Sequence, residues 1–258
     1  MDFHQFDHQF CEATVYPDRI EYANTLSSLF ITFIGLNGMR HGHSIVVFLY
    51  SALAVNGISS ALYHFYNTIG WGLMDRMTMI LIAYASFLLF LIPIGKILNL
   101  NLKLKNYSST IGKGLYLLAV MYFTSLMTAA GLHQETLFDV LFGLFLTTLP
   151  CMIYYTTKHQ KSLKLPEQLV KLSNRGIKCI IFSGIFWIIT EKLCSTFFFV
   201  KYLYGHVWWH LGVSYGGYLL SLIPLYIFLQ QHLNVRLLYD NFGIPYLSYY
   251  RSFGAEFV

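Results

Sequence analysis

The chain has 258 residues, of which 56% are hydrophobic and only 11% are charged, and its net charge is +5. Soluble domains carry roughly 25% charged residues, so this composition excludes an ordinary soluble domain and indicates a membrane protein. No cluster of basic residues alternates with aromatic ones, so we expect no nucleic-acid partner.

Apolar stretches of about 20 residues, the length that crosses a hydrocarbon core of roughly 30 Å, recur along the chain. They predict an all-α fold, a polytopic membrane protein built as a bundle of seven transmembrane helices. The start, Met1-Asp2-Phe3-His4, lacks the basic segment of a cleavable signal, so the first span should insert as it stands. The expected spans are 21–39, 45–65, 74–95, 113–132, 136–156, 177–200 and 206–230.

These spans define one membrane domain, residues 1–231, that begins with an outer arm at 1–20. The connection 157–176 is basic, so it either orients the protein or also lies along anionic headgroups. Residues 232–258 contain Gly243, Pro245 and several tyrosines. We expect them to form a cytosolic tail, either docked weakly on the surface or disordered.

The distribution of lysine and arginine predicts the orientation. With the N-terminus outside, 13 of the 17 basic residues fall on the inner side, and the odd number of spans puts the C-terminus in the cytosol. Arg19, Arg76, Lys192 and Lys201 fall outside. The inner residues are Arg40, Lys96, Lys103, Lys105, Lys113, Lys158, Lys161, Lys164, Lys171, Arg175, Lys178, Arg236 and Arg251.

Several polar residues lie inside or beside the apolar spans. Ser60 and His64 are near the end of the second span, Asp75 opens the third, and His206 and His210 open the seventh. Such groups are expensive in a membrane, which makes them functional candidates. The last two histidines are one helical turn apart on one face, a spacing that lets two imidazoles bind one metal ion.

The predicted topology brings these residues from three helices to one depth near the outer surface. Three imidazoles would form a zinc site with an open position for water, as in catalytic sites. Each residue alone also has a structural explanation. His64 could be a hydrogen-bonded core histidine, Asp75 a helix cap, and Ser60 a hydroxyl bonded to the preceding turn. Their coincidence at one depth favours the metal site.

An ordered set of motifs resembles the alkaline ceramidases. The wider superfamily of seven-helix hydrolases also includes the adiponectin-receptor-like and Per1-like proteins. The resemblance runs from residue 11 to about 220. The motifs are Cys11-Glu12, Glu21-Tyr-Ala-Asn24-Thr25-Leu-Ser27, Gly57-Ile-Ser-Ser60-Ala-Leu-Tyr-His64, Asp75-Arg-Met-Thr-Met79, Phe186-Trp187, Glu191-Lys-Leu-Cys194, His206-Val-Trp-Trp-His210 and Gly216-Gly-Tyr218.

The resemblance implies a zinc-dependent amidase that hydrolyses ceramide, or a related sphingolipid, to sphingosine and a free fatty acid. His64, His206 and His210 would hold the zinc. Asp75 would accept a proton from the attacking water, and Ser60 would support the metal site and stabilise charge on the substrate oxygen.

The resemblance also implies a disulfide between Cys11 and Cys194, while Cys151 and Cys179 stay reduced. The family binds calcium through an Asp-Trp-Cys-Glu-x-Asn run and a later Glu. Here Glu12 and Glu21 are kept, but Gln9, Phe10 and Thr14 stand where the Asp, Trp and Asn would be. Two carboxylates are few for an ion that takes six to eight oxygens, so calcium is left open.

Two other functions stay open from the sequence. One is a hydrolase of the same superfamily that acts on another lipid ester or amide. The other is a seven-helix receptor or transporter without chemistry, although residues 206–230 contain no lysine for a retinal Schiff base. In each case we expect a multi-pass integral membrane protein, in the ER or Golgi of a eukaryote or the inner membrane of a bacterium.

Overall fold

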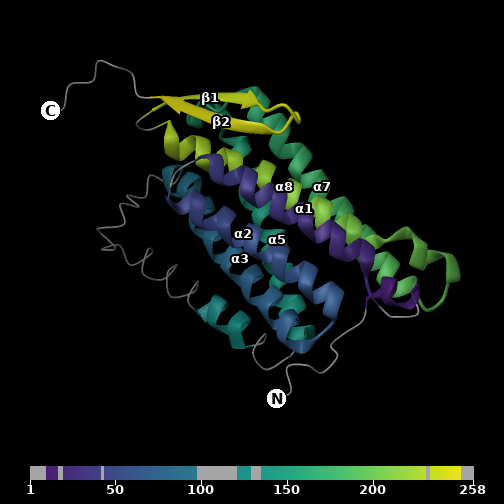
Figure 1. The fold of residues 1–258 in the computed structure, drawn as a ribbon. Helices are drawn as coiled ribbons and strands as arrows, with labels where there is room; N and C mark the ends of the chain where they lie inside the picture. The colour runs from purple at the N-terminus through teal and green to yellow at the C-terminus, as the bar shows by residue number, and fades with distance from the viewer. Residues whose placement is uncertain are drawn as a thin grey trace.

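The computed structural model of the chain describes residues 10–16, 20–41, 44–97, 121–128, 135–230 and 233–250. Within these residues the fold is a bundle of long helices with a β-hairpin laid against it (Figure 1). The long helices are α1 (Tyr22–Gly38), α2 (Ser44–Tyr66), α3 (Ile69–Ile97), α5 (Glu135–Lys158), α7 (Glu167–Leu193) and α8 (Gly205–Leu229). The short elements are η1 (Cys11–Thr14), η2 (Met39–His41), α6 (Gln160–Leu163), η3 (Phe198–Leu203), β1 (Asn234–Tyr239) and β2 (Pro245–Tyr250).

The bundle has the composition and surface of a membrane protein. Among the described residues, four helical segments are long and apolar enough to cross a bilayer: Val46–Tyr66, Ile69–Ile97, Leu137–Lys158 and Phe198–Leu229. Their neighbour α7 also turns apolar side chains outward, with Phe182 64% exposed. An apolar outer surface on apolar helices of this length indicates an integral membrane protein.

The helices follow most of the expected spans. One difference is α7, which begins at Glu167 rather than at 177, because Leu169 and Leu172 extend its buried face toward the N-terminus. The basic connection is therefore short and is mostly helical. Most of the expected span 113–132 lies outside the described residues. The part of this span that is described, residues 121–128, is helical. The count of seven spans stays a prediction.

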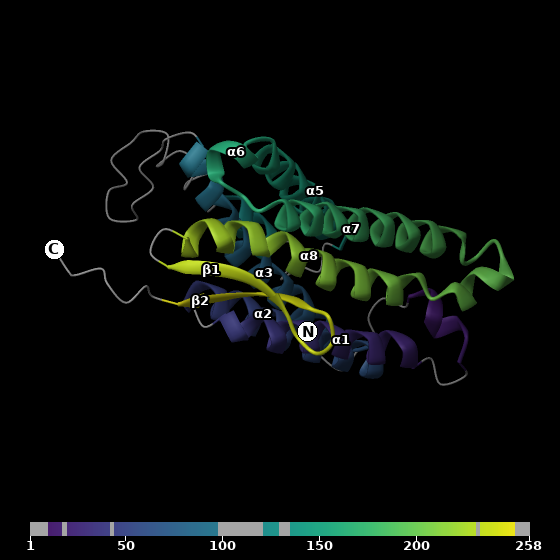
Figure 2. The same ribbon diagram turned by 90° about the horizontal axis from the view of Figure 1, so that it is seen from above.

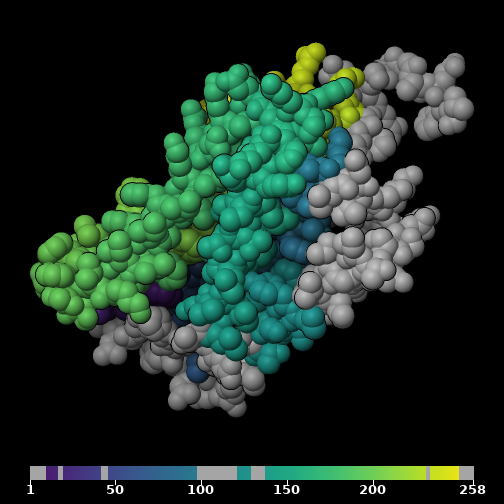
Figure 3. Space-filling model, turned by 180° about the vertical axis from the view of Figure 1, so that it is seen from behind, coloured from purple at the N-terminus to yellow at the C-terminus, as the bar shows by residue number. Residues whose placement is uncertain are grey.

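The centre of the bundle is α8, which contacts α7, α1 and α3. Small residues permit the close approach of α7 and α8: a Cβ atom on Gly216 would lie 2.8 Å from the carbonyl oxygen of Gly176. Figure 2 shows these two helices running side by side, and η3 joins them at the end of the bundle where η1 lies. Figure 3 shows the face formed by α7 and α5, with α3 beside α5.

The C-terminal segment differs from its prediction. Residues that were expected to dock weakly or be disordered form an antiparallel hairpin, in which Leu237 pairs with Leu247. Leu247 is buried, and the Tyr218 hydroxyl of α8 donates a hydrogen bond of 2.6 Å to the Pro245 carbonyl. The fold is therefore mainly helical rather than purely helical. Residues 251–258 lie outside the described part of the chain.

Candidate metal centre

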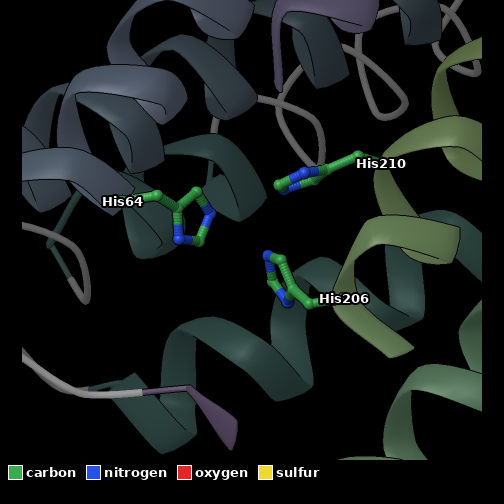
Figure 4. Close-up of side chains that lie close together, drawn as sticks. All are labelled: His64, His206 and His210. Atoms are coloured by element: carbon green, nitrogen blue, oxygen red, sulfur yellow. The ribbon is translucent and has the colours of Figure 1, made fainter. Parts of the chain in front are cut away.

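Three histidines from two helices converge at one end of the bundle. His64 lies in the last turn of α2, and His206 and His210 lie in the first two turns of α8. All three are buried, and each offers one ligand atom, with these atoms within 4.8 Å of one another. Figure 4 shows the three rings turned toward a common space between α2 and α8. This spacing suits one metal ion, and imidazole is a common zinc ligand.

Two side chains from the start of α1 hold the outer nitrogens of these rings. Glu21 Oε2 lies 2.5 Å from His64 Nδ1, and Ser27 Oγ lies 2.8 Å from His210 Nδ1. With Nδ1–H donating to these oxygens, the lone pair of Nε2 is directed toward the other histidines. Such hydrogen bonds fix the tautomer and the ring orientation of metal-binding histidines. The donor set therefore fits a zinc ion.

The acid Asp75 is tied to the same end of the bundle. It lies in the second turn of α3, where Asn56 Nδ2 donates to its Oδ1 atom at 2.8 Å. Ser60 also forms a side-chain hydrogen bond with Asp75. Because Ser60 is one helical turn before His64 on α2, it links the carboxylate to the histidine cluster. The structure thus places all five candidate site residues at the junction of α2, α3 and α8.

The N-terminal arm lies over the histidines. The phenyl ring of Phe10 is 4.1 Å from the His206 ring and 5.2 Å from the His64 ring, centroid to centroid. Cys11 is joined to Cys194 by a disulfide, and its backbone N–H donates to Glu191 Oε2 at 3.0 Å. The arm is therefore fastened to the end of α7 while its first described residue touches two of the three imidazoles.

The buried carboxylates of Glu12 and Glu21 serve as hydrogen-bond acceptors. The Glu12 oxygens accept the backbone N–H groups of Ala23 and Asn24, at 2.6 and 2.8 Å, and so cap the start of α1. Burial raises the pKa of Glu12 above its usual range, and these two hydrogen bonds oppose the shift. The Glu21 oxygens accept the Phe10 N–H and the Asn24 side-chain amide, both at 3.0 Å, besides contacting His64.

The hydrogen bonds of Glu12 and Glu21 are relevant to whether these carboxylates bind calcium. Thr14, which stands where the family has an asparagine ligand, donates its hydroxyl to the Cys11 carbonyl instead. In the described residues the Glu12 and Glu21 oxygens accept hydrogen bonds from N–H groups of the chain and contact His64, whereas calcium takes six to eight oxygen ligands. We assign no step to calcium.

The partners of the site residues were not identified from the sequence. The sequence offers Glu21 for calcium and gives Ser27 no role, whereas both contact the imidazoles. Asn56 is a further partner of Asp75, and Glu191 is a partner of the arm. One signal was present, since Asn24, Ser27 and Ser28 stand three and four residues apart in an apolar span. All three are buried, and Ser28 donates to Ser60 at 3.1 Å.

Fold and site together define a class of protein: a helical membrane protein with a buried set of three imidazoles that can hold a metal ion. The sequence model of the family described as Ceramidase matches residues 6–248. The chain therefore belongs to the ceramidase family, which implies a hydrolase that acts on amide bonds of lipids. The comparison with curated proteins gives no match.

Proposed function

We propose that the protein is a zinc-dependent intramembrane amidase that hydrolyses ceramide to sphingosine and a free fatty acid. The observation that carries the proposal is the convergence of three buried imidazoles, backed by Glu21 and Ser27, in a chain of the ceramidase family. Zinc bound there would polarise the amide carbonyl and lower the pKa of the attacking water to about 7.

Residues of the chain would bind the zinc ion, orient its ligands and transfer the proton. His64, His206 and His210 hold the ion, and Glu21 and Ser27 keep two of these rings in place. Asp75 accepts a proton from water as the oxygen adds to the carbonyl carbon. It then returns the proton to the nitrogen as the C–N bond breaks, so that the amine leaves neutral. Asn56 and Ser60 hold the carboxylate before substrate binds. In the proposed reaction the single O–H of Ser60 turns from Asp75 to the substrate oxygen, and Asn56 keeps its hydrogen bond to the carboxylate.

The proposal includes an orientation. The lysine and arginine distribution favours seven spans with the N-terminus outside and the C-terminus in the cytosol. The histidine cluster then lies toward the lumenal or periplasmic side of the membrane. That side also suits the bond between Cys11 and Cys194, because disulfides persist in oxidising compartments.

The test is a substrate comparison with purified protein. Ceramides and acylated phospholipids are incubated with the protein, with and without a zinc chelator, and released fatty acids and amines are identified by mass spectrometry. We expect sphingosine and fatty acid from ceramide, and loss of both products after chelation. Release of fatty acid from phospholipid alone would support an esterase of the same superfamily. No product from any lipid, by protein shown to contain zinc, would contradict the proposal.

Two variants separate proton transfer from metal binding. Asp75→Asn should keep zinc and lose activity by about 10²–10⁴-fold, the usual worth of a general base. His206→Ala should lose zinc and activity together. Zinc content measured beside amide hydrolysis decides the assignment, and full activity of Asp75→Asn would show that another group moves the proton.

A further inference from the structure

The tip of the C-terminal hairpin carries an apolar surface that the packing of the described residues leaves uncovered. Phe242 is 76% exposed, Tyr239 is 53% exposed and Leu238 is 40% exposed. Leu238 and Tyr239 are consecutive strand residues and therefore point to opposite faces of the hairpin, while Phe242 stands on the turn. Large apolar side chains exposed in this way are unfavourable in water and usually mark a surface that meets another apolar phase. This surface plays no part in the metal centre, because the hairpin and η3 lie toward opposite ends of the bundle (Figure 2).

The turn that presents Phe242 is held in shape by hydrogen bonds. Asp240 Oδ1 accepts the backbone N–H groups of Phe242 and Ile244, both at 2.9 Å. Gly243 has φ +72°, a left-handed conformation that glycine adopts without strain, and its N–H donates to the Asp240 carbonyl. Arg40 of η2 also pairs with Asp240 at 3.4 Å. The exposed ring is thus fixed to a defined turn.

The tip lies beside the outward face of α1. The Phe242 ring meets the Phe33 ring edge to face, with 6.0 Å between the centroids. Phe33 belongs to a stripe with Leu26, Leu29 and Leu36 whose members are three or four residues apart and are each 39–68% exposed. In a bundle of membrane helices, an outward apolar stripe of this kind faces lipid. Through the contact between Phe242 and Phe33, the hairpin tip extends the lipid-facing apolar surface of α1 to one side of this helix.

We propose that residues 239–243 form an anchor that inserts into the headgroup–acyl boundary of the membrane at the C-terminal end of α1. Tyrosine is enriched at this level because its ring is apolar while its hydroxyl is polar, which suits Tyr239. The ring of Phe242 would lie in the upper acyl layer, as the apolar side chains of interfacial segments do. Arg40, with 59% of its side chain exposed, lies at the same turn and suits the phosphate layer. The partner is the bilayer that the protein spans. The alternatives to the bilayer are that a soluble protein or a second copy of the chain covers the hairpin tip.

Fluorescence quenching tests the anchor. Phe242→Cys is made in a Cys151→Ser, Cys179→Ser background, labelled with an environment-sensitive dye and placed in phosphatidylcholine nanodiscs. Quenching is measured with nitroxide lipids labelled at the headgroup or the upper acyl chain, and with iodide in the water. Phe33→Cys serves as the lipid-facing reference, and the dye conjugate of glutathione serves as the aqueous one. Tyr239→Cys gives a second position in the tip, and thermal melting verifies that each variant is folded.

We expect the dye at position 242 to be quenched by nitroxide lipids about as strongly as the dye at position 33, and to lose most of the iodide quenching that the glutathione conjugate shows. Position 239 should fall between the two references. Iodide quenching at 242 equal to that of the free conjugate would overturn the anchor. Shielding from both iodide and nitroxide lipids would also overturn it, since protein would then cover the tip.

Discussion

At the scale of single residues, the candidate metal centre depends on polar side chains that would be costly if they lacked partners. Glu21 combines three functions: it accepts the Phe10 N–H of the arm, the Asn24 amide of α1 and the His64 ring of α2. Its buried neighbour Glu12 accepts N–H groups of α1 alone. The two carboxylates therefore differ in what their removal should change.

Substitution of each carboxylate by its amide tests this difference. Glu21→Gln weakens the acceptor behind His64, so zinc affinity should fall by about 10–100-fold. Glu12→Gln leaves one N–H of the cap without an acceptor and should lower the free energy of unfolding by about 1–3 kcal/mol, with zinc affinity unchanged. Competition with a zinc chelator and thermal unfolding measure the two quantities. An equal loss of zinc affinity in both variants would contradict the role assigned to Glu21.

At the scale of elements, the junction of α7 and α8 places the histidines of α8 relative to the rest of the bundle. Gly176 and Gly216 meet backbone to backbone across this junction, where an added Cβ atom on either would lie 2.8 Å from the carbonyl oxygen of the other. The adjacent Gly217 has open space around the same position. Gly216 and its neighbour Gly217 therefore allow a matched comparison, because an alanine at the first meets the α7 backbone and an alanine at the second meets open space.

Gly216→Ala should be destabilising by about 1–3 kcal/mol, because the methyl group forces the two helices apart. Gly217→Ala should be neutral, or stabilising by up to about 1 kcal/mol, because alanine is the better helix former. The measurement is thermal unfolding in one detergent. Equal melting temperatures for the two variants would show that the close approach of α7 and α8 is not maintained.

The hairpin is a second element whose docking depends on a buried side chain. His41 of η2 is 1% exposed, its Nδ1 atom lies 3.4 Å from the Leu247 carbonyl, and its own carbonyl accepts the Tyr249 hydroxyl at 2.8 Å. Burial lowers the pKa of His41 to about 4, against the ordinary value of 6.5. The docked hairpin therefore binds fewer protons than the undocked one between these two values.

Docking should consequently be strongest above about pH 6.5 and should weaken as the pH falls toward 4. Hydrogen-exchange protection factors for residues 234–250, measured between pH 7.5 and 4.5, should fall over this range. In His41→Gln the amide can still donate to Leu247 but does not titrate, so the fall should be smaller, while the Arg40–Asp240 pair is present in both proteins. An identical pH profile for the two proteins would assign the effect to another group.

At the scale of the whole molecule, the end of the bundle that carries the histidine cluster differs from the end that carries the hairpin. The first is closed by the disulfide-linked arm, and the second adjoins the basic residues of α6 and early α7. Lys161, Lys164, Lys171 and Arg175 are exposed there, and Glu167 is the acidic residue among them. This asymmetry of charge motivates the orientation proposed above.

A reporter fused after Val258 should accordingly be cytosolic, and a tag before Met1 should be accessible from the lumen or periplasm. Protease protection in sealed vesicles measures both positions. A C-terminal reporter on the lumenal side would reverse the orientation and would place the histidine cluster near the cytosol.

The sequence alone determined the membrane class, the positions of most helices and the three histidines, with Ser60 and Asp75 beside them. These follow from hydrophobic length and from the cost of polar groups in lipid, which are properties of local sequence. The tertiary structure alone decided which side chains stand behind the imidazoles, that the arm covers them, and that residues 234–250 form a docked hairpin. Such contacts join segments far apart in the chain, as the contact between Ser27 and His210 does. Local patterns of hydrophobicity do not indicate which distant acceptor a buried donor will meet, so these contacts could not be predicted from the sequence.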